Sequence, residues 1–174
     1  MAAGSTYTPI ATTTLGSAAT VTFSSIPSTY TDIKLVIIGG TTRATTSDVL
    51  FIRLNGDTGT NYSDTSLAGT GSAAVSQRST STTSLFDDSY VRLVGTTYGL
   101  NSTMFIDFMN YANTTTYKTA LLRCGAAETS PPGTSAAVGL WRSTSAINSI
   151  SLAGQTVSNF AVGSTFTLYG IAAA

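Results

Sequence analysis

Apolar and small polar residues alternate along most of this chain with a period of two. The alternation is clearest near the C-terminus, where single small residues separate Phe166 from Leu168 and Ile150 from Leu152. A strand with this pattern has one apolar face, which a second sheet must cover. The pattern therefore predicts two packed layers of strands. No long window keeps the three-and-four spacing of an amphipathic helix, so we expect little or no helix.

Similar patterns predict further strands upstream, and Pro131 with Pro132 predicts a turn. The segment Asp32–Gly39 becomes continuously apolar, which is typical of a strand buried on both faces at the middle of a core. We predict an all-β fold: a single-domain, antiparallel, jelly-roll-like β-sandwich of about eight to ten short strands. The other predicted strands cover residues 20–24, 49–54, 84–86, 90–94, 103–109, 117–122, 136–141, 146–152 and 164–171.

Two regions depart from regular alternation. Residues 1–19 are polar and predict an N-terminal arm or a short edge strand ahead of a sandwich domain at residues 20–174. Residues 58–83 are rich in glycine and serine, with few apolar anchors. So long a weakly patterned segment predicts a surface loop that contacts a partner.

Charge is scarce in this chain. Charged residues make up 9% of it, and eight basic side chains balance eight acidic ones. This balance leaves no net field for nucleic acid or anionic lipid, and no apolar run approaches the roughly 20 residues of a membrane span, so neither partner is expected. A net charge near zero favours self-association, which indicates an oligomer or a lattice.

Histidine is absent, which excludes Ser-His-Asp and Cys-His catalysis. Asp87 and Asp88 are adjacent and fit a turn cap, whereas Asp107 should share a face with Phe105 and lie in solvent or pair with an arginine. A glycan-cleaving enzyme with two carboxylates is the enzymatic alternative, but no motif places a pair. We therefore predict a non-enzymatic protein without a cofactor. The carboxylates available to the alternative are Asp57, Asp64, Asp87, Asp88, Asp107 and Glu128.

Two stretches could bind a ligand. Asn55, Asp57, Asn61 and Asp64 supply oxygen side chains in the manner of a calcium loop, although the closing glutamate of such a loop is missing. A glycine-shaped turn with side-chain hydrogen bonds is the simpler interpretation. Trp141 and the eight tyrosines could stack on sugar rings. The alternative is that Tyr30, Tyr62, Tyr111 and Tyr169 lie near strand ends, with the ring buried and the hydroxyl in water.

Three stretches together resemble a group of virion proteins from tailed phages of aquatic bacteria. They are residues 22–32 (TFSSIPSTYTD), the turn RLNGD at 53–57 followed by NYS at 61–63, and residues 145–150 with the ending GSTFTLYGI at 163–171. The resemblance spans roughly residues 20–171. Its most specific pieces are the Asn-Gly-Asp turn with Asn-Tyr-Ser and the Leu-Tyr-Gly-Ile ending.

The resemblance implies a β-sandwich that acts as a capsid decoration (cement) protein or as a tail-fibre module, commonly as a trimer, and it supplies no catalytic residues. The expected partners are further copies of the chain in a homotrimer and the major capsid protein or other virion proteins. In the tail-fibre alternative, a host surface glycan is a further expected partner. The expected location is the virion, assembled from protein made in the bacterial cytoplasm.

Overall fold

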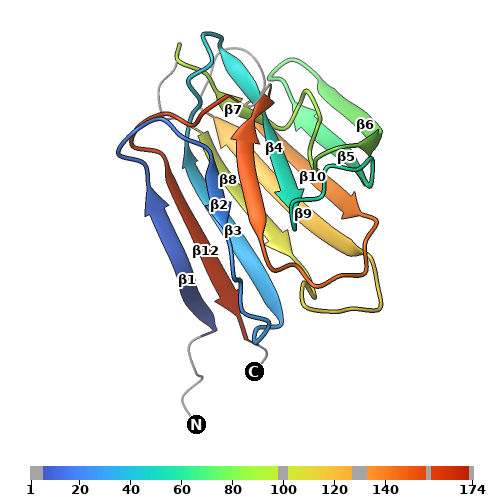
Figure 1. The fold of residues 1–174 in the computed structure, drawn as a ribbon. Coiled ribbons are helices and arrows are strands. Elements are labelled where there is room, and N and C mark those ends of the chain that lie inside the picture. Colours follow the sequence, from blue (N-terminus) through green and yellow to red (C-terminus); the bar gives the residue numbers. More distant parts are fainter. Residues whose placement is uncertain (1–5, 98–101, 127–132, 156–157, 173–174) are drawn as a thin grey trace.

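The computed structural model describes residues 6–97, 102–126, 133–155 and 158–172. The predicted turn at Pro131 and Pro132 and the candidate carboxylate Glu128 lie outside these ranges. The described part of the chain forms twelve strands in two antiparallel sheets (Figure 1). The all-β sandwich predicted from alternation is confirmed.

The larger sheet has eight strands in the order β1-β12-β3-β8-β9-β10-β5-β6, and the smaller has four in the order β2-β11-β4-β7. The strands of the larger sheet are, in that order, β1 (Tyr7–Thr14), β12 (Thr165–Ile171), β3 (Asp32–Gly39), β8 (Ser102–Phe108), β9 (Lys118–Ala126), β10 (Thr134–Trp141), β5 (Tyr62–Gly69) and β6 (Ala74–Thr82). Those of the smaller sheet are β2 (Val21–Phe23), β11 (Ile150–Gly154), β4 (Ser47–Leu54) and β7 (Arg92–Val94).

Eight of these strands follow jelly-roll connectivity. The four strands β1-β12-β3-β8 stand against β2-β11-β4-β7, and the chain crosses between the two sheets at every step but the one from β4 to β7. This order is that of two Greek keys wrapped into a sandwich. The other four strands form two hairpins, β5–β6 and β9–β10, which are inserted after β4 and β8 and widen the larger sheet beyond the smaller one.

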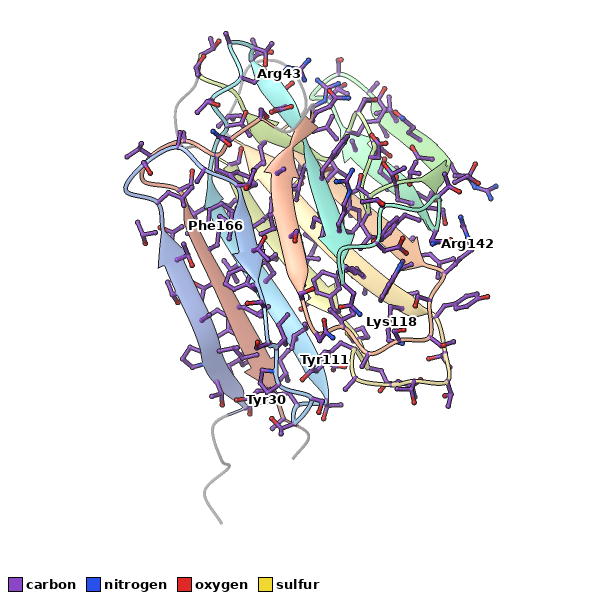
Figure 2. The ribbon with its side chains drawn as sticks, in the orientation of Figure 1. Tyr30, Arg43, Tyr111, Lys118, Arg142 and Phe166 are labelled. Carbon is purple, nitrogen blue, oxygen red and sulfur yellow. The ribbon has the colours of Figure 1, made fainter. Side chains whose placement is uncertain are left out.

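The core lies between the sheets and takes every second residue of each strand. On β3 the inward side chains are Ile33, Leu35 and Ile37, all fully buried. Phe166 of β12 meets Phe160 edge to face, with ring centroids 4.7 Å apart (Figure 2). Ile38 of β3 is 50% exposed, so the prediction that this strand is buried on both faces is wrong. A two-layer fold covers only one face of each sheet, and the outer face of β3 has no third layer.

The predicted loop at residues 58–83 is instead the hairpin β5–β6, which accounts for part of the higher strand number. β5 alternates small inward residues such as Ser66 and Ala68 with outward ones. Large apolar side chains are not needed at these inward positions, because residues 83–91 lie beneath the hairpin and bring Leu85 and Phe86 into the core. This tertiary cover compensates for a weak local pattern.

The N-terminal segment is the edge strand β1, which pairs with β12 and carries a register shift between Pro9 and Ala11. β1 is therefore a member of the larger sheet. Pro9 and the irregular register leave this edge a poor template for another strand.

Candidate functional site

The outer face of the larger sheet carries exposed apolar side chains on four neighbouring strands. They are Phe105 on β8, Leu121 on β9, Val138 on β10 and Leu67 on β5, each between 39% and 59% exposed. We call these four residues the outer apolar patch. Exposed apolar residues that are scattered singly are ordinary, but a contiguous group marks an interaction surface.

Strand register makes the patch continuous. Leu121 is directly opposite Val138, and Leu67 is directly opposite Ala136 on the same strand as Val138. Directly opposite side chains in antiparallel strands have Cβ atoms about 5 Å apart. Phe105 extends the patch onto β8 through its pairing with β9.

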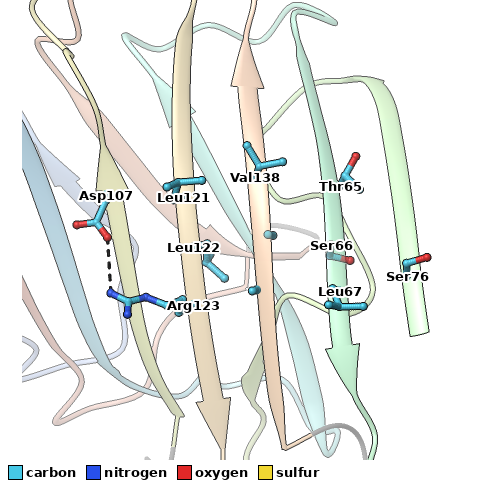
Figure 3. A pocket seen from close by; sticks show the side chains of 11 residues that line it. Thr65, Ser66, Leu67, Ser76, Asp107, Leu121, Leu122, Arg123 and Val138 are labelled. Carbon is cyan, nitrogen blue, oxygen red and sulfur yellow. Dashed lines mark ion pairs between the residues drawn. The ribbon is translucent and has the colours of Figure 1, made fainter. Parts of the chain in front are cut away.

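The sheet is hollowed over the patch. A hollow of about 610 Å³ lies over strands β8, β9, β10, β5 and β6, and Figure 3 shows Leu121, Val138 and Leu67 lining it from three neighbouring strands. We call it the outer hollow. Because its floor is hydrogen-bonded strand rather than loop, the side chains that line it are held in fixed relative positions.

Charged side chains stand at one end of the hollow. Asp107 lies 2.5 Å from the Lys34 ammonium. It also lies 3.8 Å from the Arg123 guanidinium (Figure 3). Asp107 shares a face with Phe105, as predicted. Its predicted environment was solvent or an arginine, and it pairs with two cations, of which Lys34 is nearer than Arg123. Arg123, whose side chain is 68% exposed, also lies over the Phe105 ring, 6.0 Å from its centroid. Such a placement allows a cation–π contact.

The inward neighbours of the patch explain why it stays uncovered. Ile106, Leu122 and Ala137 are buried, and each directly adjoins a patch residue in sequence. These inward residues already fill the space between the layers. The outward apolar residues are therefore in excess of what the core requires.

The candidate calcium loop is a turn. Asn55 and Gly56 have φ values of 53° and 68°, and the Asp57 amide donates to the Leu54 carbonyl at 3.0 Å. Two consecutive positive φ values define a type I′ turn, which Asn-Gly favours. The Asn55 side chain donates to the Ala146 carbonyl and accepts from the amides of residues 148 and 149, so it links the turn to the segment before β11.

Asp57 is a structural acceptor within this turn. Its Oδ1 accepts from the Gly59 amide at 2.8 Å, and its Oδ2 accepts from Asn61 Nδ2 at 2.9 Å and from Trp141 Nε1 at 2.7 Å. Burial alone would raise the pKa of Asp57, but these hydrogen bonds outweigh it and hold the pKa below its usual value. The side-chain hydrogen bonds expected of a glycine-shaped turn are thus present.

Asp64, the fourth candidate ligand, does not join the turn. It lies on β5 and points into the sandwich, only 3% exposed. The four predicted residues therefore do not converge on one point. Among the residues that the structure describes, no group of three or more His, Cys, Asp or Glu side chains is placed to hold a metal ion.

Trp141 is buried, so the exposed aromatic patch expected around it is not formed. Its ring is 3% exposed and stacks on Tyr62, with centroids 6.3 Å apart and planes 14° from parallel. The Tyr62 hydroxyl accepts from the Leu54 amide at 3.1 Å, and burial raises the pKa of Tyr62 to about 12. Tyr62 and Tyr111 are fully buried as the alternative predicted, whereas Tyr30 and Tyr169 are only partly buried, and the Tyr62 hydroxyl bonds to backbone inside the protein instead of lying in water. Trp141 offers no stacking surface to a sugar in solution.

Asp64 and Asp88 form a buried acidic pair beneath the β5–β6 hairpin. Asp88 Oδ2 accepts from Ser66 Oγ at 2.5 Å and its Oδ1 accepts from the Tyr90 amide at 2.7 Å, the turn-cap role predicted for this position. The carboxyl oxygens of Asp64 are buried without a hydrogen bond of ordinary geometry. Burial, with the charges of Asp88 and Asp87, raises the pKa of Asp64 to about 7. Both side chains are nearly fully buried, with Asp64 3% and Asp88 1% exposed.

A second, polar hollow of about 350 Å³ lies where β4 begins. Arg43 donates to Asp48 Oδ1 at 3.1 Å and to Gln155 Oε1 at 2.9 Å, and the Asp48 side chain is fully buried. Ser158 also donates to Asp48 Oδ2 at 2.5 Å. These bonds tie β4 to the segment after β11.

The sequence does contain a signal for the outer apolar patch that strand prediction alone leaves unused. Leu121 precedes Leu122, and Phe105 stands between Met104 and Ile106. In a two-layer fold, neighbouring residues of a strand point to opposite faces, so one of two adjacent large apolar residues must face outward. Which of them does so depends on the register.

Comparison with protein-family models, with curated proteins and with solved structures gave no significant match for this chain. Within the described residues, no helix has the length and apolar character needed to cross a bilayer.

Proposed function

We propose that the protein is a non-enzymatic structural protein of a phage virion, a capsid decoration protein that oligomerises and stabilises the head lattice. The observation that supports this most is the outer apolar patch, which lies on a sandwich that is otherwise poor in charge. The resemblance of residues 20–171 to phage virion proteins points the same way. Jelly rolls also recur among viral capsid proteins, although fold alone does not establish function.

The proposed mechanism is contact area repeated over many copies. Stable protein interfaces bury on the order of 1,600 Å² in total, with an apolar centre and a polar rim. The outer apolar patch supplies such a centre, and the surrounding threonine and serine side chains supply the rim. Arg123 over Phe105 places an arginine and an aromatic ring side by side, the residue types enriched among those that contribute most to binding.

Binding to capsids tests this proposal. The purified protein is added to expanded capsids that lack it, and we expect saturable binding and greater resistance of the capsids to heat. Replacing both Leu121 and Val138 with serine should lower the affinity at least tenfold, because it removes the apolar centre of the interface. The matched control is Ile38→Ser, since Ile38 is an exposed apolar residue of the same face outside the patch. A monomeric protein that does not bind such capsids would contradict the proposal.

A second candidate is a tail-fibre module that binds a host surface glycan, and the polar hollow favours it. Arg43, Gln77, Asp87 and Arg92 line this hollow, and charged and amide side chains are suited to hydroxyl groups. A glycan array tests the candidate. Binding that is lost in Asp87→Ala and kept in the Leu121→Ser, Val138→Ser double variant would favour glycan recognition over capsid docking, and an array without hits would remove it.

A further inference from the structure

We propose that the outer hollow binds a short, extended, acidic segment of a different protein, and not a second copy of this chain. The inference rests on the docking role proposed above and names the partner class of that surface. Three features support it: the dimensions of the hollow, the charges around it and the placement of the acidic residues elsewhere in the chain.

The dimensions of the hollow suit a segment. The five adjacent strands under the hollow, at about 4.8 Å spacing, span roughly 19 Å, which an extended chain rising about 3.3 Å per residue crosses in about six residues. A folded partner normally buries about 800 Å² on each side of a stable interface. The outer apolar patch and the outer hollow together make up only the centre of such an area. They are large enough, however, to hold several side chains of a single strand or loop.

The charges around the hollow favour carboxylates. Lys34 and Arg123 flank it on the β3–β8–β9 side, and Arg78 stands on β6, directly opposite Thr65 of the hollow. Two described acidic residues share this outer face: Asp107 already pairs with Lys34 and Arg123, and Asp32 at the start of β3 does not line the hollow. The surface is therefore positive overall. Arginine beside an apolar strip binds a carboxylate through two parallel N–H groups, which also fixes the direction of the bound segment.

Within the residues that the structure describes, a second copy of this chain lacks the complementary charge. Of the acidic residues that the structure describes, Asp48, Asp64 and Asp88 are buried. The others, Asp32, Asp57, Asp87 and Asp107, are partly covered, and none of the seven is fully exposed. The described surface of a copy thus offers no cluster of carboxylates beside apolar residues. Two outer hollows placed face to face would instead bring like charges together.

Selection from a displayed library of random peptides tests the inference with the full chain as bait. We expect enriched peptides that combine leucine, isoleucine or phenylalanine with aspartate or glutamate. One enriched peptide and its Asn/Gln-substituted counterpart are then titrated against the protein. The acidic peptide should bind at least tenfold more tightly, and the difference should shrink at high salt because exposed charges are screened.

Protein variants locate the binding site. Arg123→Gln should remove most of the preference for the acidic peptide, whereas the double variant Leu121→Ser, Val138→Ser should weaken both peptides. Ile38→Ser should change neither, and circular dichroism confirms that each variant is folded. Enriched peptides without acidic residues, binding that the patch variants leave unchanged, or no enrichment at all would overturn the inference.

Two further results separate this inference from the proposed function. In Leu121→Cys, a disulfide-linked pair of chains that forms quantitatively would show that a second copy occupies the hollow, and would overturn the inference. Capsid binding is measured in a separate experiment. If acidic peptides bind and capsids do not, the proposed capsid role fails and the proposed partner class stands. If capsids bind and acidic peptides do not, the capsid role stands and the partner class fails.

Discussion

At the scale of single residues, nearly every buried polar side chain described here has a partner, and Asp64 is the informative exception. Asp57 collects three donors and Asp88 collects two. Asp64 lies beside Asp88, and its carboxyl oxygens make no hydrogen bond of ordinary geometry. Two buried carboxyl groups so close together are stable only when one of them holds a proton.

Replacing Asp64 with asparagine should therefore change how stability depends on pH. The pKa of Asp64 is about 7 in the folded protein and about 4 when unfolded, so the unfolded state ionises first as pH rises. The wild type should lose stability between about pH 4 and pH 7, by at most about 4 kcal/mol, and then level off. Below pH 4 both states are protonated and this residue contributes nothing.

Urea denaturation of wild type and Asp64→Asn across this range measures the effect. The free energy of unfolding of the variant relative to that of the wild type should increase with pH and become constant above about pH 7. Other titrating groups are common to both proteins and cancel in the difference. A difference that does not vary with pH would show that Asp64 is ionised in the folded state.

At the scale of elements, the segment 83–91 decides how the widened sheet is held. Its Leu85 and Phe86 cover the inner face of the hairpin strands, and Asp88 fixes it to Ser66 of β5. The close approach of residues 83–91 to the sheet depends on Gly139 of β10, which has no side chain. A Cβ at this position would lie 2.7 Å from Leu85 Cδ2 and 3.0 Å from Phe86 Cε1. A side chain at this position would push the segment away from the sheet.

Gly139→Ala should consequently destabilise the protein by about 1–3 kcal/mol, the usual result of overpacking a core. Chemical denaturation measures the loss, and near-UV circular dichroism should report altered packing. Gly16→Ala is the control, because a Cβ at Gly16 would meet nothing within 4 Å. Equal stability of the two variants would mean that residues 83–91 do not press on β10.

At the scale of the whole molecule, the last strand closes the fold. β12 lies between β1 and β3 in the larger sheet, so segments from both ends of the chain pair side by side (Figure 1). Without β12, β1 has no neighbour among the described strands and β3 loses one side. Pairing between strands so distant in sequence must form late and slowly, because the entropy of closing the intervening loop is lost before the strand contacts are gained.

A chain ending at Gly163 should therefore not reach the native fold, whereas a chain ending at Ala172 should. Removal of β12 leaves one edge of β3 unpaired and deletes Phe166 and Leu168 from the core. The shorter chain should lack a cooperative thermal transition and bind a hydrophobic dye. A sharp transition in that chain would contradict the closing role of β12.

The strands could be predicted from the sequence where large apolar residues alternate with polar ones. β8 and β12 follow that rule closely, and the outward side chain of Asp107 was placed correctly by counting from Phe105. β5 and β6 escaped prediction because their inward residues are small and their cover comes from another segment. The outer apolar patch escaped because an outward leucine and an inward one have the same local sequence signal.

The sequence by itself determined the class of fold, since period-two alternation and turn residues act over a few neighbouring positions. It also determined the Asn-Gly turn, because positive φ at two successive positions is a local preference. Only the tertiary structure decided that Trp141 is buried, that Asp64 faces Asp88, and that Leu67, Phe105, Leu121 and Val138 form one surface. Each of these depends on register between strands distant in sequence, which no local pattern specifies.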